Sequence, residues 1–353
     1  MRRPSSRATT LLMASAFLLA LLLVAAFLPV PYVTLSPGPT FNTLGSVGDQ
    51  KVVEVSGRPT YPTSGSLDAV TVYELGAPGT QVSMLQAMRG WLDPSVAVLP
   101  RDLLYPPDET VSDVQQQASQ EMVLSQNTAI GAAQRYLGYD VLPVLVVQTV
   151  IAGEPADGKL QAGDRILAVD GSSVTSVDDV RAAIGDRKPG DDVTVTVRRD
   201  GKRQDVTLTT QAAADDPAHA VIGIVPGVVY VGPVRVRIKL GSVGGPSAGM
   251  MFSLAIIDQL TPGELTDGAH IAGTGTITIN GRVGPIGGIA QKMVGARDSG
   301  ATVFLAPATN CDEVVGAVPS GLQVVKVSSL SGAVDALDTL AKGDTNLPTC
   351  TTG

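Results

Sequence analysis

Gly244-Gly245-Pro246-Ser247-Ala248-Gly249 is a turn of small residues that runs directly into the apolar segment from Met250 to Leu260. Residues of this segment recur near helical spacing, which predicts a helix with one buried stripe and Ser247 as its N-cap. The glycines permit a tight turn, and the first N–H groups of a helix have no intrahelical partner. Such donors can stabilise an oxyanion beside the serine. Taken alone, the pattern favours a serine that only caps the helix.

Lys292, further along the chain, makes a catalytic role for Ser247 a stronger hypothesis than capping alone. The strand-like run Thr276-Ile277-Thr278-Ile279 leads into Asn280-Gly281, which predicts a type I′ hairpin. A helix is then predicted from Ile289 to about Ser299, with Lys292 in its first turn. The helix dipole at that position and burial among apolar neighbours both lower the pKa of a lysine. A lysine with a lowered pKa can act as a general base, whereas the alternative is an ordinary surface lysine.

The composition excludes several other chemistries. The 353 residues include two histidines and two cysteines, and the net charge is −8. No close group of Cys, His and carboxylate residues indicates a metal site, so we expect no metal and no cofactor. The sequence contains no G-x-x-x-x-G-K-[ST] loop, so we expect no ATP binding. Its acidic balance and few aromatic residues argue against nucleic-acid binding.

The N-terminal segment predicts a membrane anchor. Three arginines precede the apolar run from Leu11 to Leu28, and about 20 such residues span a bilayer. We expect residues 1–8 to form a cytoplasmic tail and residues 9–30 a single span of the cell membrane, because positive charge stays on the cytoplasmic side. The later residues then lie outside the cytoplasm. The alternative is a cleaved signal peptide, although no small-x-small cleavage site follows the run.

Two cysteines, Cys311 and Cys350, then lie in a compartment where thiols can oxidise. A disulfide that ties the C-terminal tail, residues 346–353, to the body is one possibility. Two free buried thiols are the other. The sequence leaves both open.

Residues 138–212 contain short strand-like runs separated by turn signals, which is typical of a small β-rich module. Val144 to Val150 is predicted to form a buried strand, and Asp178 to Ile184 a short helix. Asp191 to Arg198 alternates as a strand and leads into the hairpin signal Asp200-Gly201.

This module resembles a PDZ domain of the bacterial protease-associated kind. The resemblance rests on Pro155-Ala156, on Leu160 to Ile166 and on Val169-Asp170-Gly171. In that family a peptide adds as a strand, and backbone N–H groups of a Gly-containing loop hold its C-terminal carboxylate. The resemblance implies that Leu137, Gly138 and Tyr139 form this loop. A structural spacer is the alternative.

The two blocks around Ser247 and Lys292 together resemble the proteolytic domain of the Lon family, which uses a Ser-Lys dyad. Gly245 to Gly249 matches the nucleophile motif. The second block matches in order at Thr274-Gly275, Thr278, Gly281, Val283, Pro285 to Gly288 and Lys292. The resemblance implies that Ser247 is the nucleophile and Lys292 the general base, and that Thr274 orients the lysine amine. Gly245 and Ala248 support the turn.

Two positions depart from the Lon pattern. Gly244 stands where the family usually has aspartate, and Thr276 stands where an acidic residue is common. There is also no ATPase region of the AAA+ type in the sequence. The arrangement therefore resembles the ATP-independent, membrane-anchored Lon-like proteases.

The predicted architecture is α+β. Residues 31–137 are expected to supply an early part of the protease fold, residues 138–212 the inserted PDZ domain and residues 213–345 the rest of the Lon-like domain. The expected activity is endopeptidase cleavage of unfolded or membrane-associated extracytoplasmic proteins, with the PDZ domain assisting recognition. The resemblance also implies that the chain assembles as a homo-oligomeric ring. A catalytically silent PDZ adaptor at the membrane surface is the competing hypothesis.

Overall fold

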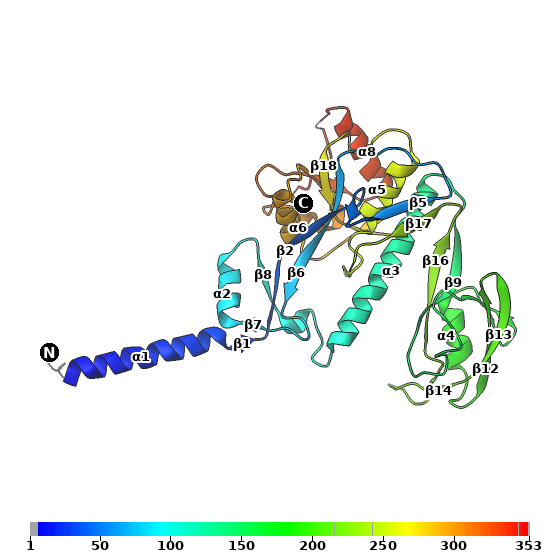
Figure 1. Ribbon diagram of the computed structural model, residues 1–353, viewed down its shortest axis with the longest axis horizontal. Coiled ribbons are helices and arrows are strands. Elements are labelled where there is room, and N and C mark those ends of the chain that lie inside the picture. Colours follow the sequence, from blue (N-terminus) through cyan, green and yellow to red (C-terminus); the bar gives the residue numbers. More distant parts are fainter. Residues whose placement is uncertain (1–5, 215, 242, 345, 352–353) are drawn as a thin grey trace. The chain divides into compact units, whose positions relative to one another are not determined.

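The computed structural model describes residues 6–214, 216–241, 243–344 and 346–351. Residues 1–5 of the expected cytoplasmic tail and residues 352–353 of the expected C-terminal tail lie outside the described residues. The chain divides into a larger unit, residues 1–137 with 234–353, and an inserted unit, residues 138–233 (Figure 1). The larger unit is therefore built from two separate stretches of chain.

Helix α1 (Ser6–Phe27) begins the larger unit. Its segment Thr9–Phe27 has a mean hydropathy of 2.5 and is long and apolar enough to cross a membrane. A signal sequence shares these features. The chain passes from α1 almost directly into β1 (Pro29–Val30), which pairs antiparallel with β7 (Val82–Ser83).

A six-stranded sheet forms the centre of the larger unit, in the order β22-β21-β18-β6-β2-β8. Strand β18 is parallel to β21 and β6, whereas β2 is antiparallel to β6 and β8. The bounds are β2 Tyr32–Asn42, β6 Ser66–Leu75, β8 Ala97–Pro100, β18 His270–Gly273, β21 Val303–Pro307 and β22 Gln323–Val327. Strands from before and after the inserted unit are neighbours here, so the sheet forms only when both stretches meet.

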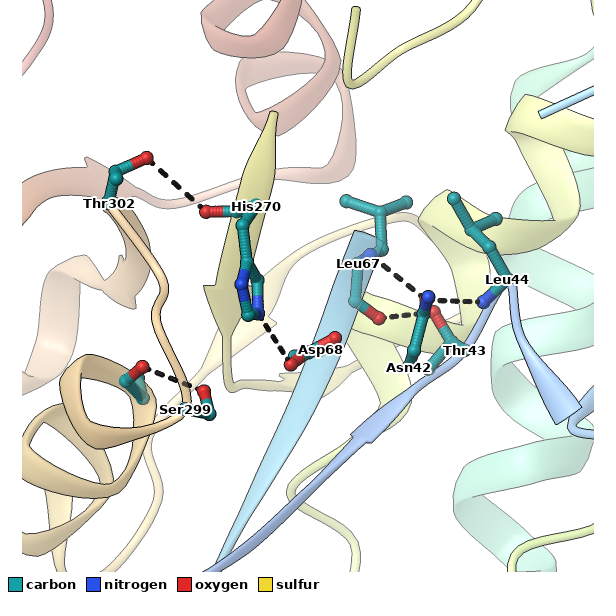
Figure 2. Close-up of polar contacts among 9 residues, drawn as sticks. Asn42, Thr43, Leu44, Leu67, Asp68, His270, Ser299 and Thr302 are labelled. Atoms are coloured by element: carbon teal, nitrogen blue, oxygen red, sulfur yellow. Dashed lines mark hydrogen bonds and ion pairs between the residues drawn. The ribbon is translucent and has the colours of Figure 1, made fainter. Parts of the chain in front are cut away.

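Polar contacts fix how three of these strands meet (Figure 2). His270 Nε2 on β18 lies 2.8 Å from Asp68 Oδ2 on β6. Leu67 N donates to Asn42 Oδ1 over 3.2 Å, and Thr43 Oγ1 donates to the Leu67 carbonyl over 2.7 Å. Asp68 and Thr43 are buried, and a buried polar group is costly unless it is paired. These contacts therefore favour one register of β2, β6 and β18.

Apolar side chains alternate between the two faces of the sheet, as the pleat of a strand requires. Ile271 and Leu305 join a core that includes residues of α3, α5 and α8, whereas Ala272 and Phe304 join a second core with α6. The helices are α3 Val111–Tyr136, α5 Gly249–Leu260, α6 Ile289–Asp298, α7 Cys311–Val314 and α8 Leu330–Ala341. Helix α5 is buried on every side from Gly249 to Gln259, so the expectation of a single buried stripe is wrong.

Short elements complete the larger unit. Strands β3 (Ser46–Val47) and β4 (Gln50–Lys51) pair with each other, and β5 (Val53–Ser56) pairs with β17 (Arg235–Ile238). Helix α2 (Met84–Leu92) and the 3₁₀ turn η1 (Arg101–Leu103) follow β7 and β8. A second 3₁₀ turn, η2 (Ala308–Asn310), precedes α7.

The hairpin between β19 (Thr276–Ile277) and β20 (Val283–Gly284) differs from the predicted type I′ turn. Gly281 has φ 75°, but Asn280 does not share a positive φ, and type I′ requires both. Gly281 N donates to the Thr278 carbonyl over 2.8 Å, and Thr278 N donates to the Arg282 carbonyl over 3.0 Å. The connection is a three-residue loop with glycine in the left-handed position.

The inserted unit is a small sheet covered by one helix. Its strand order is β13-β12-β10-β9-β16, with β11 beside β10. The bounds are β9 Leu142–Val150, β10 Arg165–Val169, β11 Ser172–Ser173, α4 Val177–Gly185, β12 Asp192–Arg199, β13 Lys202–Thr209, β14 Gln211–Ala212, β15 Ala220–Val221 and β16 Ile224–Val231. Because β16 pairs with β9, the unit extends to residue 233 and does not end at the expected residue 212.

Candidate active site

Lys292 is buried in the first turn of α6. Its side chain is 3% exposed, and desolvation lowers its pKa from 10.5 to about 8. No carboxylate within the described residues forms an ion pair with it to restore the charged form. The N-cap of helix α6 is Gly288, whose φ of 67° is in the left-handed region. A lysine in this setting is neutral in a substantial fraction of molecules near pH 8.

Thr274 connects this amine to the predicted nucleophile. Lys292 Nζ donates to Thr274 Oγ1 over 3.3 Å, and Thr274 Oγ1 donates to the Ser247 carbonyl over 3.0 Å. Gly275 N also donates to that carbonyl, over 2.7 Å. The short segment after β18 therefore fixes the backbone of Ser247 and the head of Lys292 together.

Ser247 does not cap α5, contrary to the sequence-based expectation. The N-cap is Ala248, and it makes no side-chain cap hydrogen bond. Gly245 has φ 88°, which lets the chain turn sharply before the serine. Helix α3 holds this turn: Ser125 Oγ donates to the Pro246 carbonyl over 2.9 Å, and Gly245 N donates to the Ala118 carbonyl over 3.1 Å. The serine hydroxyl is thus not committed to capping.

Ser247 and Lys292 line one cavity of about 350 Å³. Its other lining residues are Pro39, Ala69 to Glu74 of β6, Met122, Leu240, Val243, Gly244 and Ala248. Within the described residues no hydrogen bond joins Ser247 Oγ to Lys292 Nζ. The amine of Lys292 instead donates to Thr274 Oγ1. Beyond Ala69, β2 is the one partner of β6 among the strands that the structure describes. The cavity therefore has an unpaired strand edge as one wall, which suits an extended peptide.

Gly244, which stands where the Lon pattern usually has aspartate, packs closely against α3. A Cβ atom built on Gly244 would lie 2.8 Å from the Cβ of Ala118 on α3, closer than real side chains approach. The turn before Ser247 and α3 therefore pack too tightly for a side chain at this position unless one of them moves. The sequence alone gives no sign of this contact, because the two residues belong to different stretches of the chain.

Asn310 is a site-supporting residue that the sequence did not reveal. Ile286 N donates to Asn310 Oδ1 over 3.0 Å, and Asn310 Nδ2 donates back to the Ile286 carbonyl over 2.9 Å. The side chain is 2% exposed. This double contact fixes the Gly-rich stretch that leads into α6 and Lys292. A single asparagine outside any motif carries no sequence signal for such a role.

Cys311, the residue after Asn310, forms a disulfide with Cys350, with a Cα–Cα distance of 5.1 Å. Of the two alternatives that the sequence left open, the structure has the bridge. The same tail is held by a hydrogen bond from Lys326 N to the Pro348 carbonyl over 2.8 Å, and Leu347 is buried. The C-terminal segment is thus fastened beside η2 and β22.

The inserted unit has a separate apolar groove of about 490 Å³. Val180 and Ile184 of α4 form one wall, and residues 222–226 form the other. Leu137, Gly138 and Tyr139 are not among its lining residues. Leu137 is the C-cap of α3 in the larger unit, whereas Gly138 and Tyr139 line a different hollow beside the start of β9. Sequence reasoning missed the groove because ending the module at residue 212 removed one of its walls.

Two known domain families match the chain. Residues 116–210 match the PDZ domain, and residues 231–339 match the Lon protease (S16) C-terminal proteolytic domain. The PDZ match begins within α3, which the structure assigns to the larger unit. The Lon match includes Ser247, Thr274 and Lys292.

Several curated proteins share the Lon-type region. The chain is 28% identical over 187 residues to Lon protease 1 of Bacillus subtilis, covering 50% of this chain and 24% of that protein. It is 34% identical over 123 residues to Lon protease 1 of Sorangium cellulosum, covering 33% and 15%. The chain thus spans a quarter or less of the length of these relatives.

Among solved structures, the PDZ domain of the SdrC-like protein from Listeria monocytogenes is similar to this chain. The identity is 26%, the match covers 24% of this chain and 86% of that domain, and the TM-score is 0.22. The predicted α+β class is confirmed. The chain carries a PDZ domain and a serine peptidase domain of the Lon type, as the resemblance predicted.

Proposed function

We propose that this chain is an endopeptidase in which Ser247 is the nucleophile and Lys292 the general base. The observation that carries the proposal is a buried lysine, with its pKa lowered to about 8, in the same cavity as a serine that does not cap its helix. Strong pKa perturbation in a cavity is typical of catalytic groups. Thr274 hydrogen-bonds both the amine of Lys292 and the backbone carbonyl of Ser247, so it fixes their positions relative to each other.

The chemistry follows from these positions. Neutral Lys292 Nζ takes the proton from Ser247 Oγ as Oγ attacks the peptide carbonyl carbon. Backbone N–H groups of the turn at Ser247 and of the first residue of α5 are the proposed donors for the oxyanion. The protonated amine then gives its proton to the leaving nitrogen, the C–N bond breaks and an acyl-enzyme remains. Lys292 next takes a proton from a water molecule as its oxygen attacks the ester carbon, and the amine returns this proton to Ser247 Oγ as the C–Oγ bond breaks and the acid is released.

The proposed setting is the extracytoplasmic face of the cell membrane. Helix α1 supplies a single span with the N-terminus in the cytoplasm, and the Cys311–Cys350 bridge suits an oxidising compartment. The sequence contains no phosphate-binding loop, so we propose ATP-independent cleavage of unfolded or membrane-associated proteins. Assembly as a homo-oligomeric ring stays a prediction from the resemblance.

Hydrolysis of an unfolded protein tests this proposal. We expect the full chain in detergent to cleave reduced and alkylated casein without ATP, and Ser247→Ala to show at least about a thousandfold lower activity. Ser320→Ala, which changes an exposed serine, serves as the matched control and keeps wild-type activity. A wild-type protein without activity favours the silent adaptor, and equal activity in Ser247→Ala excludes the dyad.

We propose that the groove of the PDZ unit binds an extended peptide of the substrate. Ala214 is exposed and lines the groove, whereas Ala212 is exposed outside it. Ala214→Trp is expected to raise KM for casein several-fold and to leave hydrolysis of a short peptide unchanged, because the short peptide needs only the active site. Ala212→Trp is the matched control. Equal KM values for both variants would mean that the groove is a spacer.

A further inference from the structure

Helix α2 carries an exposed apolar face. Met84, Met88, Trp91 and Leu92 are spaced so that they lie on one side of the helix, and they are 38%, 50%, 56% and 85% exposed. The opposite side is closed by the buried residues Ala87 and Gly90. A capping box at Ser83 fixes where the helix begins. Such a short amphipathic helix exposes more apolar surface than water favours.

A second segment adds to this face. Leu103 and Leu104, at the end of η1, are 72% and 42% exposed. Arg89 and Arg101 are also in these two segments. We call the six apolar residues Met84, Met88, Trp91, Leu92, Leu103 and Leu104 the collar.

Both segments of the collar are fastened to the chain where it leaves α1. Met84 N donates to the Leu28 carbonyl over 2.9 Å, and Arg101 N donates to the Pro31 carbonyl over 3.0 Å. The pairing of β1 with β7 lies between them, and Figure 1 shows β1, β7 and α2 at the end of α1. The collar is therefore hydrogen-bonded to the residues that directly follow α1, with no long linker between the two.

We propose that the collar lies in the headgroup region of the bilayer from which α1 emerges. Continuity with α1 identifies the lipid surface as the occupant. Trp and Tyr are typical of this region because one end of the ring is apolar and the other polar, and Tyr32 packs edge-on against Trp91 with ring centroids 5.5 Å apart. An amphipathic helix lies in the interface plane with its apolar face in the acyl boundary. The inference rests on the membrane anchoring proposed above.

If the collar lies in the headgroup region, the larger unit is in direct contact with the membrane surface. An anchor followed by a flexible linker would let that unit sample many distances from the bilayer. Here the collar and the strands after α1 set one depth and one orientation for the larger unit. Substrate segments close to the membrane surface then meet the active site at a fixed height.

Trp91 is the single tryptophan of the chain, so its fluorescence reports on the collar directly. We expect the full chain in lipid vesicles to emit at shorter wavelength than in a water-exposed state. Lipids brominated in the upper acyl chain should remove more than half of the emission, and aqueous iodide should quench it weakly. Vesicle flotation, measured on the same samples, reports separately whether α1 anchors the protein.

The variant Met88→Asp/Leu92→Asp places charge on the collar without touching the buried residues of α2. It is expected to float like the wild type and keep its far-UV circular dichroism, while Trp91 emission shifts to that of water-exposed tryptophan and quenching by brominated lipid is lost. Leu142→Asp, an exposed leucine of the inserted unit, is the matched control and changes nothing.

Protein that floats while its Trp91 emission stays water-like overturns the collar and leaves the anchor intact. Protection that depends on protein concentration, without quenching by lipid, also overturns it and identifies a second copy as the occupant. Protein that does not float overturns both the anchor and the collar. Loss of casein cleavage, by contrast, bears on the dyad alone.

Discussion

Replacing Lys292 by methionine is expected to stop peptide hydrolysis and, at the same time, to increase the free energy of unfolding. Activity falls by at least about a thousandfold because Lys292 is the proposed acceptor of the serine proton and methionine cannot take that proton. Stability rises because methionine fills the same apolar space without a charge to desolvate. A loss of activity coupled to a gain of stability is what a buried catalytic lysine predicts, whereas an ordinary structural residue gives losses of both.

The pH dependence of this stabilisation has a definite sign. Folding lowers the pKa of Lys292 from 10.5 to about 8, so the folded state binds this proton more weakly than the unfolded state. Above pH 10.5 Lys292 is neutral in both states and burying it costs no stability. As the pH falls from 10.5 towards 8, the unfolded state gains this proton first, and the free energy of unfolding decreases. At about 1.4 kcal/mol per pKa unit, the cost near pH 7 is about 3 kcal/mol.

Urea unfolding at two pH values measures this effect. Lys292→Met should be more stable than the wild type by about 2–3 kcal/mol at pH 7, and the difference should shrink towards pH 10. Lys342→Met, which removes an exposed lysine, should change stability little at either pH. A variant that is less stable than the wild type at pH 7, or that still cleaves casein, would contradict the role of Lys292.

Loss of the Cys311–Cys350 bridge is the second large effect that we expect. The bridge closes a loop with a sequence separation of 39, and in the chain-entropy description such a loop contributes about 4 kcal/mol. The variant Cys311→Ala/Cys350→Ala should therefore unfold at a markedly lower urea concentration than the wild type. Activity should fall as well, because Asn310 beside Cys311 holds the backbone of Ile286 ahead of Lys292.

Two further measurements separate these contributions. Asn310→Ala should lower kcat more than it raises KM, with a smaller loss of stability than the cysteine variant. Alkylation before and after reduction counts the thiols of the full chain. Two alkylated thiols without reduction would show that the bridge does not form, and an unchanged unfolding curve after reduction would show that it adds no stability.

Local patterns predicted much of the fold, and long-range contacts account for what they missed. Helix α3 extends from Val111 to Tyr136, and its ends coincide with local signals, Thr110 as N-cap and the glycine after Leu137. The groove of the PDZ unit was missed because its second wall, β16, reaches β9 from far along the chain. Asn310 and the contact between Gly244 and Ala118 likewise depend on tertiary packing that no local pattern encodes.

The site was predictable to the extent that its residues lie in motifs. Ser247, Thr274 and Lys292 belong to two ordered blocks, and the structure places Ser247 and Lys292 in one cavity with Thr274 between their polar atoms. The N-cap at Ala248 and the three-residue hairpin at Gly281 were not predictable from propensity. In both places tertiary packing selects between turn geometries of similar energy.

Trapping of the acyl-enzyme tests the central claim most directly. The full chain is mixed with an activated peptide ester, quenched in acid within one turnover and analysed by mass spectrometry of the intact protein and of its fragments. We expect one acyl group on Ser247, forming faster as the pH rises through about 8, none in Ser247→Ala and almost none in Lys292→Met. An acyl group on another residue, or equal acylation in Lys292→Met, would contradict the Ser247–Lys292 dyad.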